Sequence, residues 1–458
     1  MSTDIQPLNA LERRAVSALA SIFAVRMLGL FLILPIFAPY AAQLKGQSAF
    51  LVGLAIGMYG LTQALFQIPL GILSDRLGRK PVIIGGLLLF CAGSIVAALA
   101  DSIVGVIIGR GLQGAGAIAA AVMALVADLT RDEQRTKAMF VIGVSIGASF
   151  IASLLLGPVA DQAIGVRGVF WLTAMLALIA IAVLLTAVPT PVHSTQHLDA
   201  QPIPAQLVGV LRNTQLLQFD FGIFVLHGAL TALFVVIPIA LIEYAQLAVH
   251  EHWRVYLPAM VLSLLVVFPA VTLGERRRRI QLVFVGAVAT LIVSQGVLFH
   301  GYQSVTQVIL GLCLFFIGFN ALEAMLPSLI SKIAPVGAKG TAIGVYSTFE
   351  FFGAFVGGAA AGLVFGEYGI TGVFVLAGAL LLLWLGVALT MDEPQHFATR
   401  LLHVGPQRPG RAKALSEELG AIAGVTEAIV IAGEGVAYLK VDTRVLDEQA
   451  LDKYSAAP

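Results

Sequence analysis

Long apolar runs separated by short polar stretches dominate the chain. Runs such as 81–100, 102–127 and 370–391 are each about 20 residues or slightly longer, the length that an α-helix needs to cross the hydrocarbon of a membrane. The first run, 15–42, is too long for a cleavable signal peptide, and further apolar runs follow it. Read in order, the runs predict an all-α membrane protein with twelve transmembrane helices near residues 16–43, 49–69, 81–100, 103–127, 137–160, 167–188, 217–245, 253–272, 281–300, 304–331, 341–364 and 370–391.

Composition supports the membrane interpretation. The 458 residues are 59% hydrophobic and only 12% charged, whereas about 25% of the residues of a soluble domain are charged. A net charge of +1 gives no indication of nucleic-acid binding. Cys91 and Cys313 both lie inside apolar runs, so neither a disulfide framework nor a metal site is predicted.

Basic residues lie mainly in alternate loops, which predicts the orientation. Loops on the other side hold little beyond Lys45, Arg167 and Arg254. Because Lys and Arg in short loops stay on the cytoplasmic side, both termini are expected there. The basic loops contain Arg76, Arg79, Lys80, Arg131, Arg135, Lys137, Arg276–Arg279, Lys332 and Lys339.

The chain repeats itself weakly. The charged loop 71–80 has a counterpart in "GERRRR" at 274–279, and "TKAMFVIGVS" at 136–145 has one in "GTAIGVYS" at 340–347, each about 200 residues later. The repeat predicts two six-helix halves, with a substrate site between them near the membrane midplane. We therefore expect an N-terminal bundle at 1–190, a cytoplasmic linker at 191–216 and a C-terminal bundle at 217–392.

Residues 398–458 are polar and differ from the rest of the chain. They predict a strand at 399–404, a helix at 411–424, a hairpin at 426–442 and a helix at 445–454. The order βαββα indicates a small α+β ferredoxin-like domain without its last strand. Its loop 405–411 has no Cys-x-x-Cys and no His cluster, which disfavours metal binding. Binding of a small ligand, docking of a partner and self-association remain open, because a fold alone does not choose among them.

Three motifs resemble one family. "GILSDRLGRKPVI" at 71–83 resembles the loop between helices 2 and 3 of the major facilitator superfamily (MFS). "RGLQGAGAIA" at 110–119 and Gly157-Pro158 resemble signatures in helices 4 and 5 of its drug:proton antiporters. The two glycines that usually follow the Gly-Pro pair are replaced by Asp161 and Gln162. The resemblance covers all twelve helices and is strongest to members with a C-terminal domain. It implies the MFS fold and alternating access.

The charged loop is expected to act as a conformational latch. By resemblance, Gly71, Asp75, Arg79 and Asp128 hold the two halves together on the cytoplasmic side of the outward-facing state. Asp75 is expected at the start of predicted helix 11, near Gly340, where free amides favour an anion, and Arg79 beside Asp128. The alternative is that these residues are ordinary topology charges, as we expect for Arg76 and Lys80.

Six ionisable residues lie inside predicted helices, where charge is expensive and indicates function. Five lie on helices 1, 4, 7 and 10, which by resemblance line the central cavity. Glu323 can bind a proton in low dielectric, or form a static ion pair with Arg26. Arg110, linked to proton coupling by resemblance, could instead anchor carbonyls of helix 1. Asp220 could be interfacial, His227 a packing residue and Glu350 structural. The proton-coupling candidates are Glu323, Arg110, Asp220 and His227; the cavity candidates are Arg26, Gln113, Asn320 and Glu350.

Two glycine pairs have the spacing that lets membrane helices pack closely, namely Gly143 with Gly147 and Gly353 with Gly357. The sequence contains no phosphate-binding GxxxxGK[ST] loop, and its spans contain no nucleophile–base pair, so neither ATP drive, a cofactor nor enzyme activity is predicted. We expect a proton-coupled exporter of small amphipathic compounds in the cell inner membrane. The alternatives are an uncoupled or importing carrier and a membrane sensor that signals through its tail.

Overall fold

The computed structural model describes residues 8–190, 204–276, 279–391, 397–430, 435–442 and 444–454. Within these ranges, ten helices are long and apolar enough to cross a membrane. Two of them are double: α7 (Asp132–Thr186) is interrupted at Gly165, with φ 69°, and α13 (Lys339–Leu389) at Gly369, with φ 64°. Glycine tolerates this left-handed geometry, which breaks each helix into two spans. The described residues therefore contain twelve spans, as predicted.

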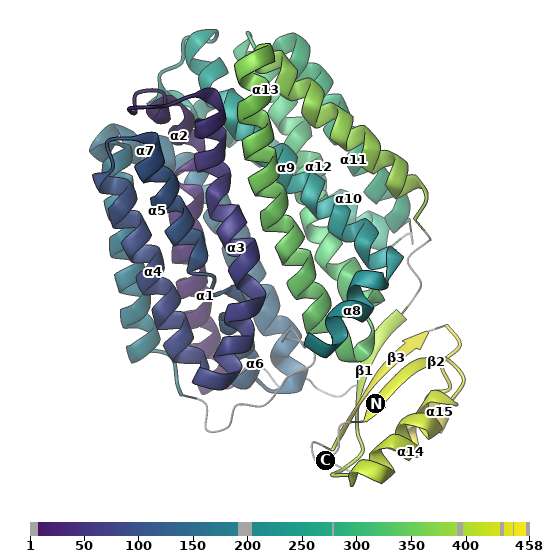
Figure 1. The fold of residues 1–458 in the computed structure, drawn as a ribbon. Coiled ribbons are helices and arrows are strands. Elements are labelled where there is room, and N and C mark those ends of the chain that lie inside the picture. The colour runs from purple at the N-terminus through teal and green to yellow at the C-terminus, as the bar shows by residue number, and fades with distance from the viewer. Residues whose placement is uncertain are drawn as a thin grey trace.

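The spans form two bundles that stand side by side (Figure 1). The first contains α1 (Ala10–Phe31), α2 (Leu34–Ala41), α3 (Ala49–Leu77), α4 (Arg79–Leu99), α5 (Ile103–Ala115), α6 (Ala119–Asp128) and α7. The second contains α9 (Thr214–Glu243), α10 (Trp253–Arg276), α11 (Ile280–Gly301), α12 (Val305–Ile333) and α13, with the short elements α8 (Pro204–Arg212), η1 (Val249–Glu251) and η2 (Val336–Ala338). Residues 191–203 of the predicted linker lie outside the described residues, and its second half contains α8 and the start of α9.

Three predicted boundaries differ from the structure. The second predicted helix ends at 69, but α3 continues to Leu77, so most of the charged loop is helical. The turn into α4 is made at Gly78, whose φ of 92° suits glycine. The first and fourth spans are each broken once, between α1 and α2 and between α5 and α6.

The two bundles meet where α3 crosses α13. Figure 1 shows these helices side by side at the end away from the C-terminal domain, here called the distal end, and diverging toward the other, here called the tail end. The contact is between backbones: a Cβ on Gly57 would lie 2.7 Å from the carbonyl oxygen of Phe355, and one on Gly358 would lie 2.7 Å from that of Gly53. Glycine is therefore required for this approach.

The two predicted glycine pairs have different fates. Gly353 and Gly357 pack against the backbone of α9 at Phe224 and Gly228, which confirms the prediction for this pair. Gly143 and Gly147 are exposed, and no described atom lies within 4 Å of the position of a Cβ on either, so the prediction is wrong for them. They lie on an exposed face of α7, which spacing alone does not reveal.

The C-terminal domain has the predicted βαββα order. It contains β1 (Phe397–His403), α14 (Pro409–Gly420), β2 (Val425–Val430), β3 (Val436–Asp442) and α15 (Glu448–Asp452), and the antiparallel sheet has the order β1-β3-β2. Leu415 and Leu419 of α14, Leu439 of β3 and Leu451 of α15 form the core on one face of the sheet. This is the ferredoxin-like arrangement with three strands among the described residues.

The other face of the sheet is docked on the turn between α12 and α13. Tyr438 and Val436 of β3 pack on Val336 of η2 and are buried. Lys440 Nζ donates to the carbonyl of Ile333 at 2.8 Å, at the end of α12. A Glu427 carboxylate oxygen accepts the Val336 amide at 3.0 Å. The ammonium group of Lys440 therefore lies at the carbonyl end of α12, and the carboxylate of Glu427 lies at the amide end of η2. Each charge has the sign that stabilises the helix end it contacts.

Exchanging these two charges tests whether they recognise the turn. Glu427 and Lys440 face each other across β2 and β3, so Glu427→Lys with Lys440→Glu keeps their mutual attraction. Both new charges then meet the wrong helix end, where each favourable contact was worth about 0.3–1 kcal/mol. We expect the amides of 334–338 to exchange hydrogen about tenfold faster or more in the double variant, measured by mass spectrometry on the whole protein. Unchanged protection would mean that apolar contacts alone hold the domain; Lys440→Arg is the control.

Candidate functional site

Three of the predicted ionisable residues meet in the second bundle. His227 of α9 lies with its Nε2 2.7 Å from Oε1 of Glu323 on α12 and 3.7 Å from Oε1 of Glu350 on α13. Two carboxyl groups from two other helices therefore approach the same imidazole nitrogen.

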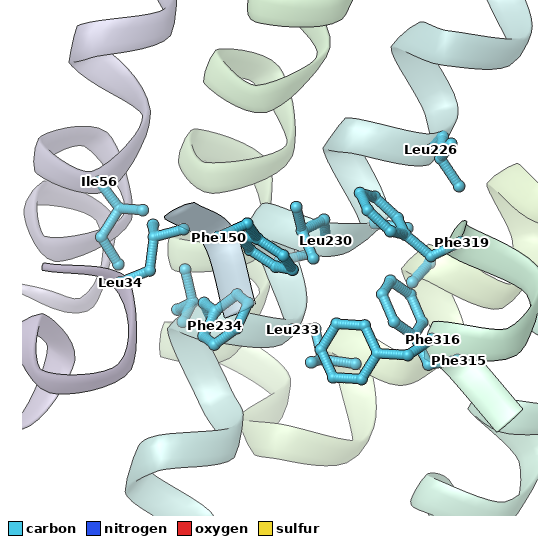
Figure 2. Packing of buried hydrophobic residues seen from close by; sticks show 14 of the residues in the cluster. Leu34, Ile56, Phe150, Leu226, Leu230, Leu233, Phe234, Phe315, Phe316 and Phe319 are labelled. Atoms are coloured by element: carbon cyan, nitrogen blue, oxygen red, sulfur yellow. The ribbon is translucent and has the colours of Figure 1, made fainter. Parts of the chain in front are cut away.

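This acidic cluster, defined as His227, Glu323 and Glu350, is open to solvent. The Glu323 side chain is 34% exposed and that of Glu350 is 23% exposed, although both residues lie well inside membrane-length helices. Phe319, one turn before Glu323, packs on the imidazole with ring centroids 5.6 Å apart. Figure 2 shows Phe319 and Phe316 on one side of the contact between the bundles and Phe150 of α7 on the other. The cluster therefore lies beside the boundary between the halves.

Asp220 is buried, which corrects the interfacial alternative. It lies in the second turn of α9, but its exposed fraction is 1%. The surrounding helices cover this end of α9: Phe219 contacts Phe284 of α11, and Trp384 of α13 lies against Gly222. Neither carboxylate oxygen has a hydrogen-bond partner among the described residues.

The first bundle contains the two predicted arginines. Arg26 of α1 donates to the side chain of Gln63 at 2.7 Å and to the carbonyl of Gly116 at 3.1 Å. Arg110 of α5 donates to Gln113 at 3.0 Å. Both guanidinium groups lie over the ring of Tyr59 of α3, at 5.9 and 5.3 Å from its centroid. These cation–π contacts partly replace the missing anions.

Two alternatives for these arginines are corrected. Within the described part of the chain, Arg26 has no ion pair with Glu323, whose partner is His227. The backbone carbonyl near Arg110 is that of Ile56, at 3.5 Å, on α3 rather than on the first span. The break at 116–118 and the side chain of Gln63 supply the acceptors of Arg26, whereas the backbone of α3 supplies the carbonyl near Arg110.

The remaining cavity candidates bridge helices. Gln113 of α5 donates to Ser94 of α4 at 2.8 Å, and Asn320 of α12 donates to Ser263 of α10 at 3.2 Å. Gly157 of the helix 5 signature lies against the break between α1 and α2, where a Cβ would come within 2.7 Å of the Leu32 carbonyl oxygen. Pro158 follows it inside α7. Gly157 therefore permits a close helix approach.

The latch residues are partly assembled. Arg79 Nε lies 3.1 Å from a carboxylate oxygen of Asp128, the pairing expected from the sequence, and Arg79 also pairs with Asp75. Gly71 is buried, and its carbonyl accepts a hydrogen bond from Ser74. In this conformation Asp75 therefore binds within its own half, and Thr341 at the start of α13 binds Gln206 of α8 at 3.3 Å. Contact of Asp75 with α13 stays a prediction for the other conformation.

The Asp75→Asn variant distinguishes the ion pair with Arg79 from the expected contact of Asp75 with the start of α13. Asp128 and Ser74 still bind Arg79, so we expect the protein to fold and insert normally. Losing a charged partner for helix amides costs roughly 1.5–3 kcal/mol, so transport is expected to fall at least about tenfold. Uptake or efflux in vesicles with matched protein amounts measures this. The exposed neighbour Arg76→Gln is the control. Normal transport by Asp75→Asn would remove the latch role.

Tyr59 and Gln63 are site residues that the sequence analysis missed. Tyr59, Gln63 and Gln67 recur every four residues on α3, and Gln63 donates to Gln67 at 2.8 Å. A polar stripe at helical spacing in a membrane helix is a readable signal. Tyr346, one turn before Glu350, is buried, and its hydroxyl has no hydrogen-bond partner among the described residues. Tyr59 and Gln63 carry no charge, so a search for charged residues inside the predicted helices did not select them.

Twelve spans in two bundles, with ionisable side chains gathered at the boundary between them, define a membrane transport protein of the two-bundle class. Comparison with known proteins gives the same result. The family model described as Major Facilitator Superfamily matches residues 19–350 and 220–419. The chain belongs to this family, as the sequence motifs predicted.

Individual relatives extend the match. The inner membrane transport protein YajR of Escherichia coli (strain K12) is 43% identical over 96% of this chain and 97% of its own, which includes the C-terminal domain. The multidrug resistance protein MdtH of Yersinia enterocolitica is 26% identical over 73% of this chain and 81% of its own. A crystal structure of a bacterial homologue of the lysosomal transporter Spinster superposes with a TM-score of 0.70 at 13% identity, covering 84% of this chain and 98% of that one. The last likeness concerns the fold alone.

Proposed function

We propose that this protein is a proton-coupled transporter that exports small amphipathic compounds across the cell inner membrane by alternating access. The observation that carries the proposal is the contact of His227 with Glu323 and Glu350 inside the spans, with both carboxyls partly exposed to solvent. An ionisable group inside the membrane is energetically costly, so its presence there points to a role in the transport of an ion or substrate.

The names of the relatives support the proposal. YajR is described as an inner membrane transport protein, and MdtH as a multidrug resistance protein. The orientation follows from the basic loops: the tail end is cytoplasmic, with both termini on that side. The structure then corresponds to a state closed on the distal, outer side.

In the proposed cycle the bundles 1–190 and 217–392 rock against each other. Loading and release of a proton at Glu323 changes the charge between the bundles and so selects which side opens. Asp220 and His227 are further proton-binding groups on α9, and Arg110 shapes the field from the first bundle. Closure of the tail end brings Asp75 to the start of α13.

The test is proton movement in proteoliposomes that contain the purified protein. A proton gradient is imposed, and amphipathic cations, zwitterions, anions and neutral compounds are added while the lumenal pH is followed. We expect at least one class to trigger proton flow that empty liposomes lack. Flow of the compound without proton movement would leave an uncoupled carrier and contradict the proton coupling.

Docking of the tail domain on the α12–α13 turn favours a second candidate, a membrane sensor. The two helices joined by this turn carry Glu323 and Glu350, so a ligand between the bundles could alter the docking. Deletion of residues 397–458 separates the candidates. A transporter retains flux when the domain is deleted. A sensor still binds its ligand, but it carries no flux either with the domain or without it.

A further inference from the structure

The two halves carry opposite charges close to their common boundary, where Tyr59, the ring beneath both arginines, contacts Phe351 of α13. The first half contributes two guanidinium groups, Arg26 and Arg110. The second contributes the acidic cluster, in which two carboxyl groups approach one imidazole nitrogen. This separation of charge has a direct consequence for what can bind between the halves.

Among the described residues, the two guanidinium groups have no anionic partner. Arg26 is 2% exposed and Arg110 is 1% exposed. Their hydrogen-bond acceptors are neutral, and Nε and Nη1 of Arg26 and Nε of Arg110 have no partner in the part of the chain that the structure describes. By contrast, Arg79 pairs with Asp128 and Arg131 with Glu12.

A buried cation without an anion is strongly unfavourable, and removal of its water is repaid by a well-placed carboxylate. The nitrogens of Arg26 and Arg110 that have no partner among the described residues are N–H donors of a cation, for which a carboxylate is a stronger acceptor than any neutral group. A carboxylate supplied by the substrate would therefore complete this site.

The acidic cluster, in contrast, favours a cationic ligand. One imidazole can neutralise one carboxylate, so Glu323 and Glu350 together retain an excess of negative charge when both are ionised. Both side chains are partly open to solvent, so an incoming cation can reach them. An ammonium group fits because it is compact and donates in three directions.

Aromatic rings connect the two sites. Tyr59, on which both arginines lie, contacts Phe351 of α13 with ring centroids 6.3 Å apart. Phe351 directly follows Glu350 in the chain. A molecule that reaches from the arginines to the acidic cluster therefore crosses apolar ring surface.

We propose that the substrate is an amphipathic zwitterion whose carboxylate binds Arg26 and Arg110, whose ammonium group binds Glu323 and Glu350, and whose apolar middle lies against Tyr59 and Phe351. This inference rests on the proposed function, because it places the substrate between the two halves. It also explains exchange: a proton and the ammonium group compete for the same carboxylates, so arrival of one releases the other.

The test uses compounds of graded length on the purified full-length protein. Straight-chain ω-amino acids from 4-aminobutanoate to 12-aminododecanoate are compared by calorimetry with the alkylamine and the alkanoate of each length. At the best length we expect the zwitterion to bind about tenfold tighter or more than either singly charged analogue, since each end gains a charge-assisted contact. If, at every length, one singly charged analogue binds as tightly as the zwitterion, the proposal is wrong.

Variants assign the two ends. The Arg26→Gln variant should bind the zwitterion no more tightly than it binds the alkylamine of the same length. The Glu323→Gln variant should bind the zwitterion no more tightly than it binds the alkanoate of the same length. Arg26→Lys keeps the cation and should keep a preference for the zwitterion, and Arg76→Gln should change nothing. A preference unaltered in Arg26→Gln would contradict the carboxylate site.

Proton movement in proteoliposomes separates this proposal from the proposed function. Binding of the zwitterion without proton movement would leave the substrate class standing and remove the coupling. Proton movement driven by alkylamines but not by zwitterions would leave the coupling standing and overturn the substrate class.

Discussion

Replacing Glu323 by Gln is expected to reduce substrate-driven proton movement to the level of empty liposomes. The amide has nearly the shape of the carboxyl group and can still contact His227, which lies 2.7 Å from it in the native protein, but it cannot carry a proton. Binding of compounds that do not use a cationic group should persist. The measurement is lumenal pH after addition of substrate to proteoliposomes under an imposed gradient.

The control for this variant is Glu367→Gln, a carboxyl that is exposed at the distal end. It should behave as the native protein does. Proton movement that persists in Glu323→Gln would keep the coupling and assign the proton to Asp220, His227 or Glu350. The same experiment on Glu350→Gln and Asp220→Asn would then distinguish these groups.

Gly57→Val is expected to disfavour closure of the distal end. A Cβ at this position would lie 2.7 Å from the carbonyl oxygen of Phe355 and 2.9 Å from its Cα, and both atoms belong to the backbone of the opposite half. Such overpacking costs about 1–3 kcal/mol. That cost falls only on the state in which α3 and α13 touch, so the population of this state should decrease about fivefold or more. Transport should fall with it.

Spin labels at Gln47 and Glu367 report this change, because both residues are exposed near the distal ends of α3 and α13. The distance between them should lengthen in Gly57→Val. Gly143→Val is the matched control, since no described atom lies within 4 Å of its Cβ position. An unchanged distance with normal transport would mean that the backbone contact is not needed for closure.

The sequence predicted the fold well because each span must be apolar over about 20 residues, which leaves a strong pattern. It also predicted the pairing of Arg79 with Asp128, since the motif limits the partners. It did not predict the cluster of His227 with Glu323 and Glu350. That contact depends on how α9, α12 and α13 are rotated about their axes, and the hydrophobic pattern of a largely buried helix does not fix its rotation.

Partners of the arginines were missed for a different reason. Their acceptors are a glutamine side chain and a backbone carbonyl, which a search for opposite charges does not consider. Asp220 was misjudged because its place near a helix end suggested water, whereas neighbouring helices cover that end. Identical glycine spacing at 143–147 and 353–357 led to opposite environments, since spacing does not say which face has a neighbour.

The interruption between α5 and α6 has a consequence for attempts to stabilise this protein. A continuous helix would use the carbonyl of Gly116 for its own backbone ladder, whereas the break leaves that oxygen to Arg26, at 3.1 Å. The carbonyl group of the broken segment thus accepts a hydrogen bond from the guanidinium group that water would otherwise accept. An engineer who restored ideal helical sequence at 116–118 would be expected to gain helix propensity and to strand a charge in the membrane. The lost hydrogen bond to Arg26 should therefore offset the gain in helix propensity, so that repair at this point stabilises the protein less than the same substitutions do in an ordinary helix.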